Sequence, residues 1–239
     1  MSTTSSFEVS SIATIETPFK QKFAVPRQPN LARAKGTITF NEGFNDINML
    51  KGIESYSHLW LLFVFHQNIE RGWKSAVKAP RLGGNATIGV FASRSTHRPN
   101  SIGMSVVENE GIAIEKGKVT LKVTGVDLVS GTPLIDIKPY ISYADSISGA
   151  RDTLDDINPI PHRDVYFAPN LSTALAKIEN RHRDFCSLVT AVLAQDPRPA
   201  YKQQNDNDEK TYRVTLYDID VGFKIKDANV WVTELTPLG

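Results

Sequence analysis

The sequence predicts a mainly β protein, with an N-terminal β-barrel-like domain and a small C-terminal α+β domain. Up to Tyr140, short alternating apolar segments are separated by turn residues, and no long helical pattern occurs. Beyond Pro161 the apolar residues recur at helical spacing before alternation returns. Strands without a helix to cover them favour closure into a barrel or a strongly curved sheet, and a following helix with strands favours a separate α+β unit.

Composition is that of a globular protein in a reducing compartment. The 239 residues are 41% hydrophobic and 22% charged, with a net charge of +1 and one cysteine, Cys186, which excludes an intrachain disulfide. The longest apolar run, Leu59 to Phe65, is too short to span a bilayer, and Met1 to Ser11 lacks the features of a signal peptide. We therefore expect a cytoplasmic protein that has no membrane partner.

The predicted domain boundaries follow composition. Residues 1–144 contain the barrel-like domain, residues 145–165 form an acidic linker that ends in Asn-Pro-Ile-Pro, and residues 166–239 form the C-terminal domain.

Strands are expected at several places in the first domain: Phe7–Glu16, Gly36–Phe40, Ser57–Gln67, Ile88–Ala92, Met104–Asn109, Gly111–Glu115, Lys118–Asp127 and the alternating part of Asp127–Tyr140. Ser57–Gln67 is the most hydrophobic and is expected to be buried on both faces. Turns at Glu110-Gly111 and Lys116-Gly117 predict an antiparallel meander.

In the second domain the apolar spacing predicts one long amphipathic helix. It runs from a cap at Asn170 or Ser172 to the stop at Asp196-Pro197, and three short strands follow it to Leu235.

The stretch Pro80–Ser105 carries the chemistry that points to a ligand. Gly83 and Gly84 allow close approach of the backbone, and Arg94 and Arg98 lie beside a Pro-Asn turn that would hold them in place. From Ile69 to Asn100 there are six positive side chains and one negative. A fixed cationic loop predicts an anionic or polar ligand, although a basic segment can also be a solvated face.

Several enzyme classes are disfavoured. His58 and His66 lie about 26 Å apart if a strand joins them, so they cannot share one metal ion, and we expect no metal. No G-x-G-x-x-G, G-x-x-x-x-G-K-[ST] or G-x-S-x-G motif occurs, which argues against Rossmann, P-loop and α/β-hydrolase enzymes. A metal-dependent hydrolase is therefore the weakest hypothesis.

Five segments together resemble one family: FAVPRQP, SHLWLLFVFHQ, PRLGGNATIGVFASRSTHRPNSIGMS, DLVSGTPLIDIKPY and DPRPAY. In order and over nearly the whole chain they are similar to the TsaA-like tRNA methyltransferases. The resemblance implies an S-adenosylmethionine-binding β-barrel that methylates N6 of threonylcarbamoyladenosine at position 37, in the anticodon loop of threonine tRNA. It also implies a homodimer with the donor near the subunit interface.

Carried over residue by residue, the resemblance predicts the donor contacts, and the chemistry of the acceptor predicts a base. The donor contacts are Pro26, Arg27, Gln28, Phe65, His66, Arg94, Met104, Asp127, Leu128, Ser130, Gly131 and Thr132. The acceptor nitrogen is a poor nucleophile beside a carbamoyl group, so a base is expected: Asp127 first, then Tyr140 and His66.

Arg98 and Lys138 are the predicted RNA-binding residues, since cationic side chains suit phosphate or the threonyl carboxylate. Plainer readings remain open: Asp127 as a turn cap, His66 as a structural histidine, and Lys138 in a surface ion pair with Asp136. The alternative function is a β-barrel that binds S-adenosylmethionine or tRNA without catalysis.

Overall fold

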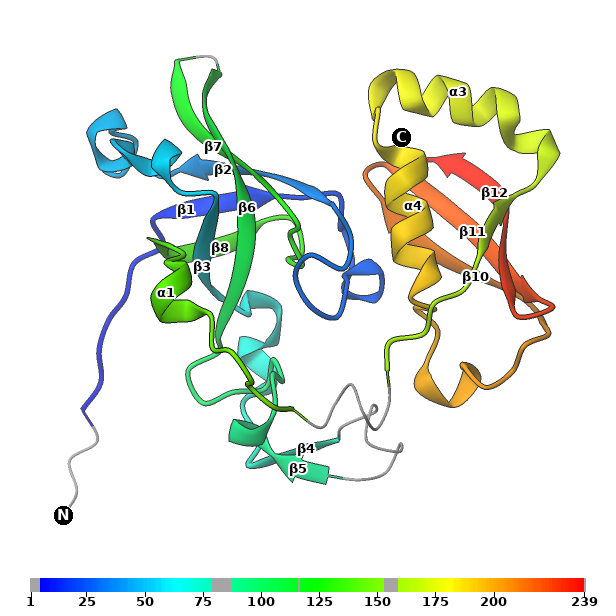
Figure 1. The fold of residues 1–239 in the computed structure, drawn as a ribbon, viewed down its shortest axis with the longest axis horizontal. Coiled ribbons are helices and arrows are strands. Elements are labelled where there is room, and N and C mark those ends of the chain that lie inside the picture. Colours follow the sequence, from blue (N-terminus) through cyan, green and yellow to red (C-terminus); the bar gives the residue numbers. More distant parts are fainter. Residues whose placement is uncertain (1–4, 79–86, 116, 153–158, 239) are drawn as a thin grey trace.

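The computed structural model describes residues 5–78, 87–115, 117–152 and 159–238. Arg81, Gly83 and Gly84 of the basic stretch lie outside them. Six strands form a closed barrel in the order β1-β2-β7-β6-β3-β8 (Figure 1). They are β1 (Ala13–Glu16), β2 (Lys35–Phe40), β3 (His58–Val64), β6 (Ile102–Glu115), β7 (Lys118–Thr124) and β8 (Thr132–Pro139).

The barrel closes because the short strand β1 pairs antiparallel with both β2 and β8. Alternation along the strands then places one set of side chains inside, among them Ile15, Ile38, Leu61 and Leu121, each fully buried. The predicted barrel is confirmed. The prediction for the most hydrophobic strand is wrong in one respect, because β3 alternates between buried and half-buried residues and so is buried on one face only.

Two strands that were predicted separately, Met104–Asn109 and Gly111–Glu115, belong to one strand. The expected turn at Glu110-Gly111 is a β-bulge within the single 14-residue strand β6, where the pairing with β7 shifts between Asn109 and Gly111. The bulge uses Gly111 at φ 92°, and the Asn109 side chain accepts from its N–H, so one strand bends instead of ending.

The expected strand Phe7–Glu16 begins only at Ala13. The expected buried strand Ile88–Ala92 is not a single strand, because a short strand and a 3-10 helix share these residues. Strand β5 (Thr87–Gly89) pairs with β4 (Ala76–Lys78) in a small hairpin, and the 3-10 helix η6 (Val90–Ala92) follows. Figure 1 shows this hairpin outside the barrel, where no sheet covers it. Further short helices are η1 (Lys22–Ala24), η2 (Ile47–Leu50), η3 (Ile53–Ser55), η4 (His66–Arg71) and α1 (Ser142–Asp145).

The C-terminal part is a four-stranded sheet with helices along it. Strands β10 (Asp208–Leu216), β11 (Ile219–Lys226) and β12 (Asn229–Pro237) are antiparallel, and β9 (Val165–Phe167) joins β12 in parallel. The short helices η7 (Pro169–Leu171) and η8 (Ala200–Lys202) flank the helical segment. This α+β arrangement is as predicted.

The single long helix is wrong, because the segment forms α3 (Ser172–Arg181) and α4 (Phe185–Ala194). Side chains at the break make tertiary contacts that a continuous helix would not allow. His182 stacks on Tyr217 with ring centroids 4.1 Å apart, and Asp184 accepts from the Tyr217 hydroxyl at 2.8 Å. Neither Asn170 nor Ser172 caps the start with its side chain.

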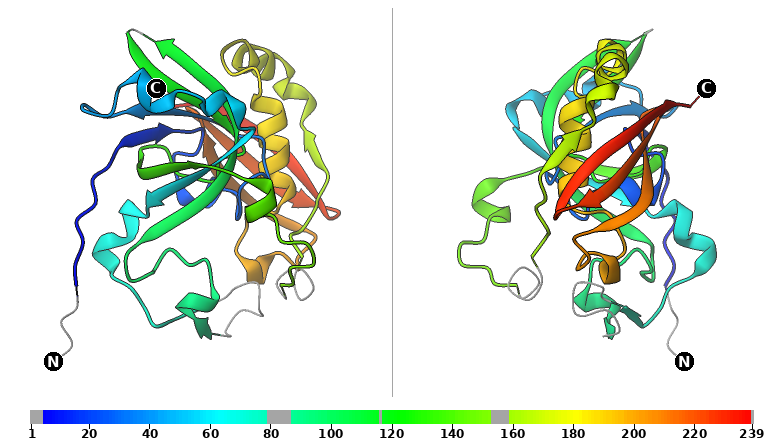
Figure 2. Two further views of the ribbon diagram at one scale, coloured as in Figure 1. Left: turned by 60° about the vertical axis from the view of Figure 1, so that its left-hand side comes forward. Right: turned by 90° about the vertical axis from the view of Figure 1, so that its right-hand side faces the viewer.

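The two parts share one continuous hydrophobic core, and Figure 2 shows α3 and α4 beside the barrel from two further sides. Buried Phe19, just after β1, forms an isolated bridge with Leu216 at the end of β10. The Tyr217 N–H donates to the Pro18 carbonyl at 2.8 Å, and Gln195 Nε2 donates to the Leu31 carbonyl at 3.1 Å. The C-terminal part is thus packed directly against the segment that leads from β1 to η1.

A buried ion-pair network fixes the loop after α4. Arg198, which is fully buried, donates through Nε and Nη2 to the two oxygens of Asp196 at 2.8 and 2.7 Å. Arg163 reaches the same carboxylate at 2.9 Å. Arg163 also pairs with Asp206 at 2.8 Å, so two carboxylates match the two cations.

Among the described residues, no helix is long and apolar enough to cross a membrane.

Candidate active site

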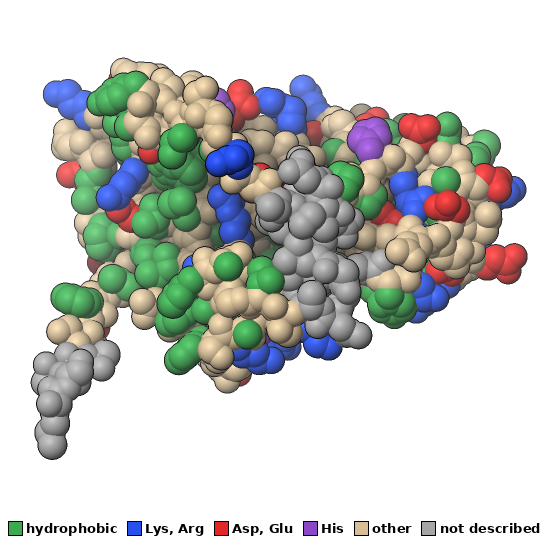
Figure 3. Space-filling model, turned by 60° about the horizontal axis from the view of Figure 1, so that its bottom comes forward, with side chains coloured by type: hydrophobic (Ala, Val, Ile, Leu, Met, Phe, Trp, Pro, Cys, Tyr) green, Lys and Arg blue, Asp and Glu red, His purple; other side chains and the backbone are tan. Residues whose placement is uncertain are grey.

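A pocket of about 480 Å³ opens at the end of the barrel where β3 passes into η4 and β6 begins. Its size lies within the range of small-molecule sites. It is lined by five segments: Lys22–Gln28, Phe63–Asn68, Ser93–Arg98, Ile102–Ser105 and Asp127–Thr132. Figure 3 views the molecule from the β4–β5 side, where Lys and Arg side chains lie among hydrophobic ones.

Asp127, which follows β7, is the one carboxylate among the described residues that line this pocket. Its Oδ1 accepts the hydroxyl hydrogen of buried Ser105 at 2.6 Å. Desolvation by the pocket walls raises the pKa of Asp127 to about 6, although the hydrogen bond from Ser105 and the charge of Arg94 act in the opposite direction. A carboxylate with this pKa is ionised at pH 7 and still basic enough to accept a proton.

The turn that follows Asp127 is fixed by contacts with β1. Thr17 Oγ1 donates to the Leu128 carbonyl at 2.8 Å, and the Ser130 and Gly131 N–H groups donate to the Phe19 and Ile15 carbonyls at 2.8 Å. Leu128 and Thr132 line the pocket, whereas Ser130 and Gly131 do not. The turn therefore has a structural role in orienting Asp127.

The Pro26–Gln28 loop is held against the same region by Asn30. The Asn30 N–H donates to the Gly125 carbonyl at 2.9 Å, and Asn30 Nδ2 donates to the Val106 carbonyl at 3.2 Å. Gly125 has φ 86°, and a side chain there would overlap the Asn30 amide. A residue with a Cβ at position 125 is therefore excluded both by backbone conformation and by space.

Two arginines come from the loop before β6. Arg94 Nη1 donates to Gln28 Oε1, which ties the two loops together across the pocket. Arg98 Nη1 donates to the Ser93 carbonyl at 2.7 Å and to the Val90 carbonyl at 3.3 Å. Arg98 thus braces its own loop while lining the pocket.

An apolar surface forms the other part of the lining. The rings of Phe63 and Phe65 meet edge to face with centroids 5.2 Å apart. Gly103 makes room for them, because an added Cβ would overlap Phe63 and lie 2.8 Å from Phe65 Cζ. Ile102 and Met104 continue this surface to the outside, where they are 39% and 52% exposed.

The structure brings together most of the residues singled out from the sequence. Those that line the pocket are Pro26, Arg27, Gln28, Phe65, His66, Arg94, Arg98, Met104, Asp127, Leu128 and Thr132.

Four candidates do not line the pocket: Ser130 and Gly131 of the turn after Asp127, and Tyr140 and Lys138. Tyr140 packs on Trp60 and His58, with ring centroids 5.7 and 6.2 Å away, at the opposite end of β3 from the pocket. Tyr140 is therefore not among the residues that line the pocket around Asp127. Lys138 is exposed and lies 3.8 Å from Asp136, which is the surface ion pair of the plainer reading.

Sequence reasoning missed several pocket residues, notably Lys22, Asn68, Thr96 and Ser105. The signal was weak for Lys22 and Asn68, which come from 3-10 helices with no periodic pattern. Ser105 was detectable in principle, since it is a polar residue on the inward face of a barrel strand. Among the described residues, no group of three or more His, Cys, Asp or Glu side chains is placed to hold a metal ion.

Comparison with known proteins places the chain in a family. The model of the tRNA-methyltransferase O N-terminal domain matches residues 14–146, and that of the TrmO C-terminal domain matches residues 161–238. A tRNA (adenine(37)-N6)-methyltransferase of Escherichia coli K12 is 44% identical over 98% of this chain and 99% of its own length. The chain belongs to the tRNA-methyltransferase O family.

Other family members agree in sequence and structure. A putative S-adenosylmethionine-dependent methyltransferase of Pseudomonas aeruginosa is 45% identical over 89% of this chain and 90% of its own length. A crystal structure of TrmO from Pseudomonas aeruginosa superposes with a TM-score of 0.80 at 36% identity, covering 97% of this chain and 99% of that one. The tRNA-methyltransferase O fold is therefore shared along the whole length.

Proposed function

We propose that the protein is an S-adenosylmethionine-dependent tRNA methyltransferase that methylates N6 of the adenosine at position 37, next to the anticodon. The observation that carries the proposal is Asp127, held by Ser105 in a pocket of small-molecule size with a pKa raised to about 6. The Escherichia coli relative, 44% identical over nearly the whole chain, is named for this reaction.

The pocket offers what the methyl donor requires. Phe65 and Met104 provide an apolar surface for the adenine, and Arg94 and Gln28 provide polar partners for the amino-acid end. The carboxylate of Asp127 and the π face of Phe65 suit a sulfonium nearby. The donor brings an activated methyl group to the pocket, and placing the acceptor nitrogen in line with the carbon–sulfur bond lowers the barrier by orientation.

Methyl transfer to N6 releases a proton, and in this mechanism Asp127 accepts it. The N6–carbon bond forms as the sulfur–carbon bond breaks and its electron pair returns to sulfur, so S-adenosylhomocysteine leaves. The N6 proton passes to the Asp127 carboxylate. We propose that the acceptor is threonylcarbamoyladenosine of threonine tRNA, whose carbamoyl group withdraws the N6 lone pair and makes such a base necessary.

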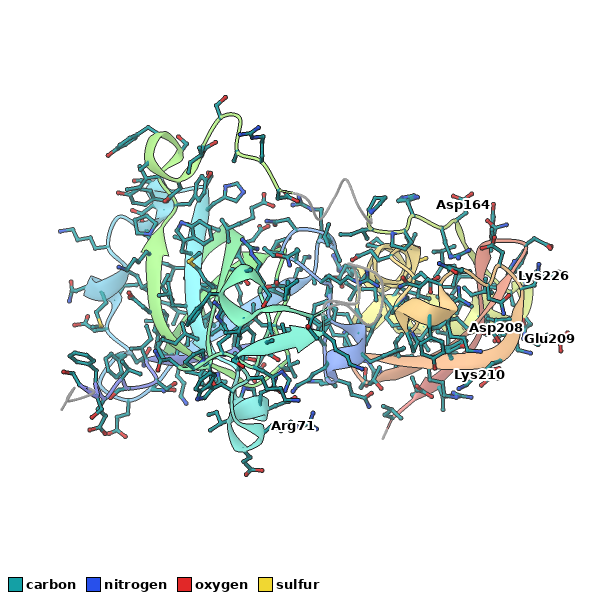
Figure 4. The ribbon with its side chains drawn as sticks, turned by 90° about the horizontal axis from the view of Figure 1, so that it is seen from below. Arg71, Asp164, Asp208, Glu209, Lys210 and Lys226 are labelled. Atoms are coloured by element: carbon teal, nitrogen blue, oxygen red, sulfur yellow. The ribbon has the colours of Figure 1, made fainter. Side chains whose placement is uncertain are left out.

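Exposed aromatic and basic side chains beside the pocket suit an RNA loop. Trp73 and Phe91 are 59% and 80% exposed, on segments joined by the hydrogen bond from the Val90 N–H to the Ser75 carbonyl at 3.0 Å. Lys78 lies on β4 and Lys74 just before it, and Arg71 projects from η4 in Figure 4. Aromatic faces stack on unpaired bases, and cations attract the phosphates. Arg98 and Lys138 remain proposed RNA contacts.

We propose a homodimer that forms through the outward face of β3 and β6. Near the pocket the outward residues of both strands are apolar, and Leu62 lies directly across from Met104, whereas His58 and Glu108 at the far end are polar. Ile102 and Met104 belong both to this exposed face and to the pocket. A partner seated there would complete the donor site and remove apolar surface from water.

The competing function is a protein that binds S-adenosylmethionine or tRNA without catalysis. A methyl-transfer assay distinguishes it from the methyltransferase. The test is incubation of the purified protein with methyl-labelled S-adenosylmethionine and threonine tRNA that carries, or lacks, threonylcarbamoyladenosine, followed by nucleoside analysis. We expect label on the modified adenosine alone. Donor and tRNA binding without any label would establish the binding protein.

A further inference from the structure

A row of three polar side chains crosses the mouth of the pocket. The Lys22 ammonium, from η1, donates to Asn68 Oδ1, from η4, and Asn68 Nδ2 donates to Thr96 Oγ1. All three line the pocket. They come from three segments that are distant in sequence, so the fold assembles the row.

Asn68 is the fixed member. It is only 4% exposed, its backbone N–H donates to the Phe65 carbonyl at 2.8 Å, and both ends of its amide are occupied. A buried amide with every group bonded has one orientation, because turning it over would face donor to donor. Asn68 therefore holds the more exposed Lys22 side chain over the pocket.

Lys22 has no opposite charge to neutralise it in the part of the chain that the structure describes. Its hydrogen-bond acceptor is the neutral amide of Asn68, which takes one of the three ammonium hydrogens. Partial desolvation and the nearby charge of Arg71 both lower the pKa of Lys22. An anion placed against Lys22 would favour the charged ammonium and so offset both effects on its pKa.

The charge of the whole pocket lining also favours an anionic ligand. Four cationic side chains and one carboxylate line it among the described residues: Lys22, Arg27, Arg94, Arg98 and Asp127. S-adenosylmethionine carries a net positive charge and does not balance this excess. Arg94 and Arg98 each use one guanidinium nitrogen to brace the loops, and Lys22 keeps two ammonium hydrogens for a ligand.

We propose that Lys22, positioned by Asn68 and Thr96, forms a carboxylate-binding subsite at the mouth of the pocket. Its exposed position favours the threonyl carboxylate of the acceptor nucleoside, which enters from solvent on the tRNA, over the α-carboxylate of the donor. The identity of this occupant rests on the proposed function. Either source is a carboxylate, and binding measurements separate them.

The test compares Lys22→Met, which keeps the length and removes the charge, with Lys22→Arg, which restores a cation. Lys20→Met, an exposed lysine outside the pocket lining, is the matched control. The affinity for tRNA is measured with S-adenosylhomocysteine present, so that no turnover is needed. The two tRNA ligands carry threonylcarbamoyladenosine either with its free carboxylate or as the methyl ester.

We expect Lys22→Met to weaken binding of the free-carboxylate tRNA about tenfold, since hydrogen bonds to charged groups are worth about 1.5–3 kcal/mol. Binding of the ester should be equally weak in the wild type and in the variant, because the double change removes the same contact. Lys22→Arg should recover part of the loss, and Lys20→Met should behave as the wild type.

The outcomes are distinguishable. If Lys22→Met weakens only the affinity for S-adenosylmethionine, in a titration without tRNA, the subsite holds the donor carboxylate. If neither affinity changes, or if the variant discriminates acid from ester as well as the wild type does, the subsite is refuted. Absence of methyl transfer by the wild type refutes the proposed function but leaves these binding comparisons decisive.

Discussion

At the scale of single residues, the environment of Asp127 sets both its chemistry and its stability cost. The ionised carboxylate is desolvated in the folded protein, so the native state binds its proton more tightly than the unfolded chain does. Because the folded pKa of about 6 lies above the ordinary value of 3.8, wild-type stability from this residue falls as the pH rises from about 4 through 6.

Asp127→Asn should therefore stabilise the fold above pH 6. The raised pKa limits the gain in the free energy of unfolding to about 3 kcal/mol, at roughly 1.4 kcal/mol per pKa unit. Solvent in the open pocket screens the charge, so we expect a gain of about 1–2 kcal/mol. Thermal unfolding should show a higher Tm for the variant at pH 7.5 and no difference at pH 4. Asp164→Asn, an exposed carboxylate on the C-terminal part in Figure 4, should gain nothing. A variant that is less stable than the wild type at pH 7.5 contradicts the desolvation argument.

Gly103 is the second residue whose identity the site requires. Gly103→Ala would push a methyl group into the Phe63 ring and against Phe65, so we expect a loss of about 1–3 kcal/mol of stability and weaker donor binding. Chemical denaturation and calorimetric titration with S-adenosylmethionine measure the two effects. Gly89→Ala, where an added Cβ meets open space, is the control. Unchanged affinity in Gly103→Ala would remove Phe65 from the donor contacts.

At the scale of elements, the sequence predicted strands better than it predicted where they bend or end. Alternation identified the strand positions, but the bulge in β6 and the break between α3 and α4 depend on contacts that no local pattern encodes. Asn109 reaches the Ile53 and Tyr56 carbonyls at 2.8 Å, and Asp184 accepts from Tyr217 in the turn between β10 and β11. Propensity suggested a turn and a continuous helix there, and tertiary contacts overrode it.

We expect the segments that flank the β4–β5 hairpin, with Trp73 before β4 and Phe91 in η6, to contact RNA. Trp73→Ala and Phe91→Ala should each weaken tRNA binding by about 1–3 kcal/mol, the usual range for base stacking on an aromatic ring. Binding isotherms at fixed salt measure this, and affinity for S-adenosylmethionine should not change. Phe7→Ala, an 88% exposed aromatic residue before β1, is the control. Equal tRNA affinity in all three variants would assign RNA binding to another surface.

At the scale of the whole molecule, the pocket exists only because the barrel closes. Loops that are far apart in the sequence meet at one barrel end, where Gly125 and Asn30 bind each other and Arg94 binds Gln28. The residues carried over from the family resemblance converge there in large part, whereas Lys22, Asn68 and Thr96 do not stand out in the sequence. Their proximity follows from barrel closure and from no local motif.

The outward face of β3 and β6 provides a test of assembly. Leu62→Glu places a charge in the proposed interface without touching the barrel interior, so sedimentation velocity should show a monomer where the wild type is a dimer. Thr39→Glu, on the outward face of β2, should leave the dimer intact. Circular dichroism verifies that both variants fold. A monomeric wild type, or a dimeric Leu62→Glu, excludes this face as the interface.

We propose that Asp127 takes the N6 proton during methyl transfer, and the pH dependence of the single-turnover rate tests this role. With saturating S-adenosylmethionine and threonylcarbamoyladenosine-containing tRNA, the wild-type rate should rise with pH and level off above an apparent pKa near 6. At saturating donor, Asp127→Asn should lose at least about 100-fold in rate and lose this pH dependence. An Asn variant with the wild-type rate and profile would contradict the claim.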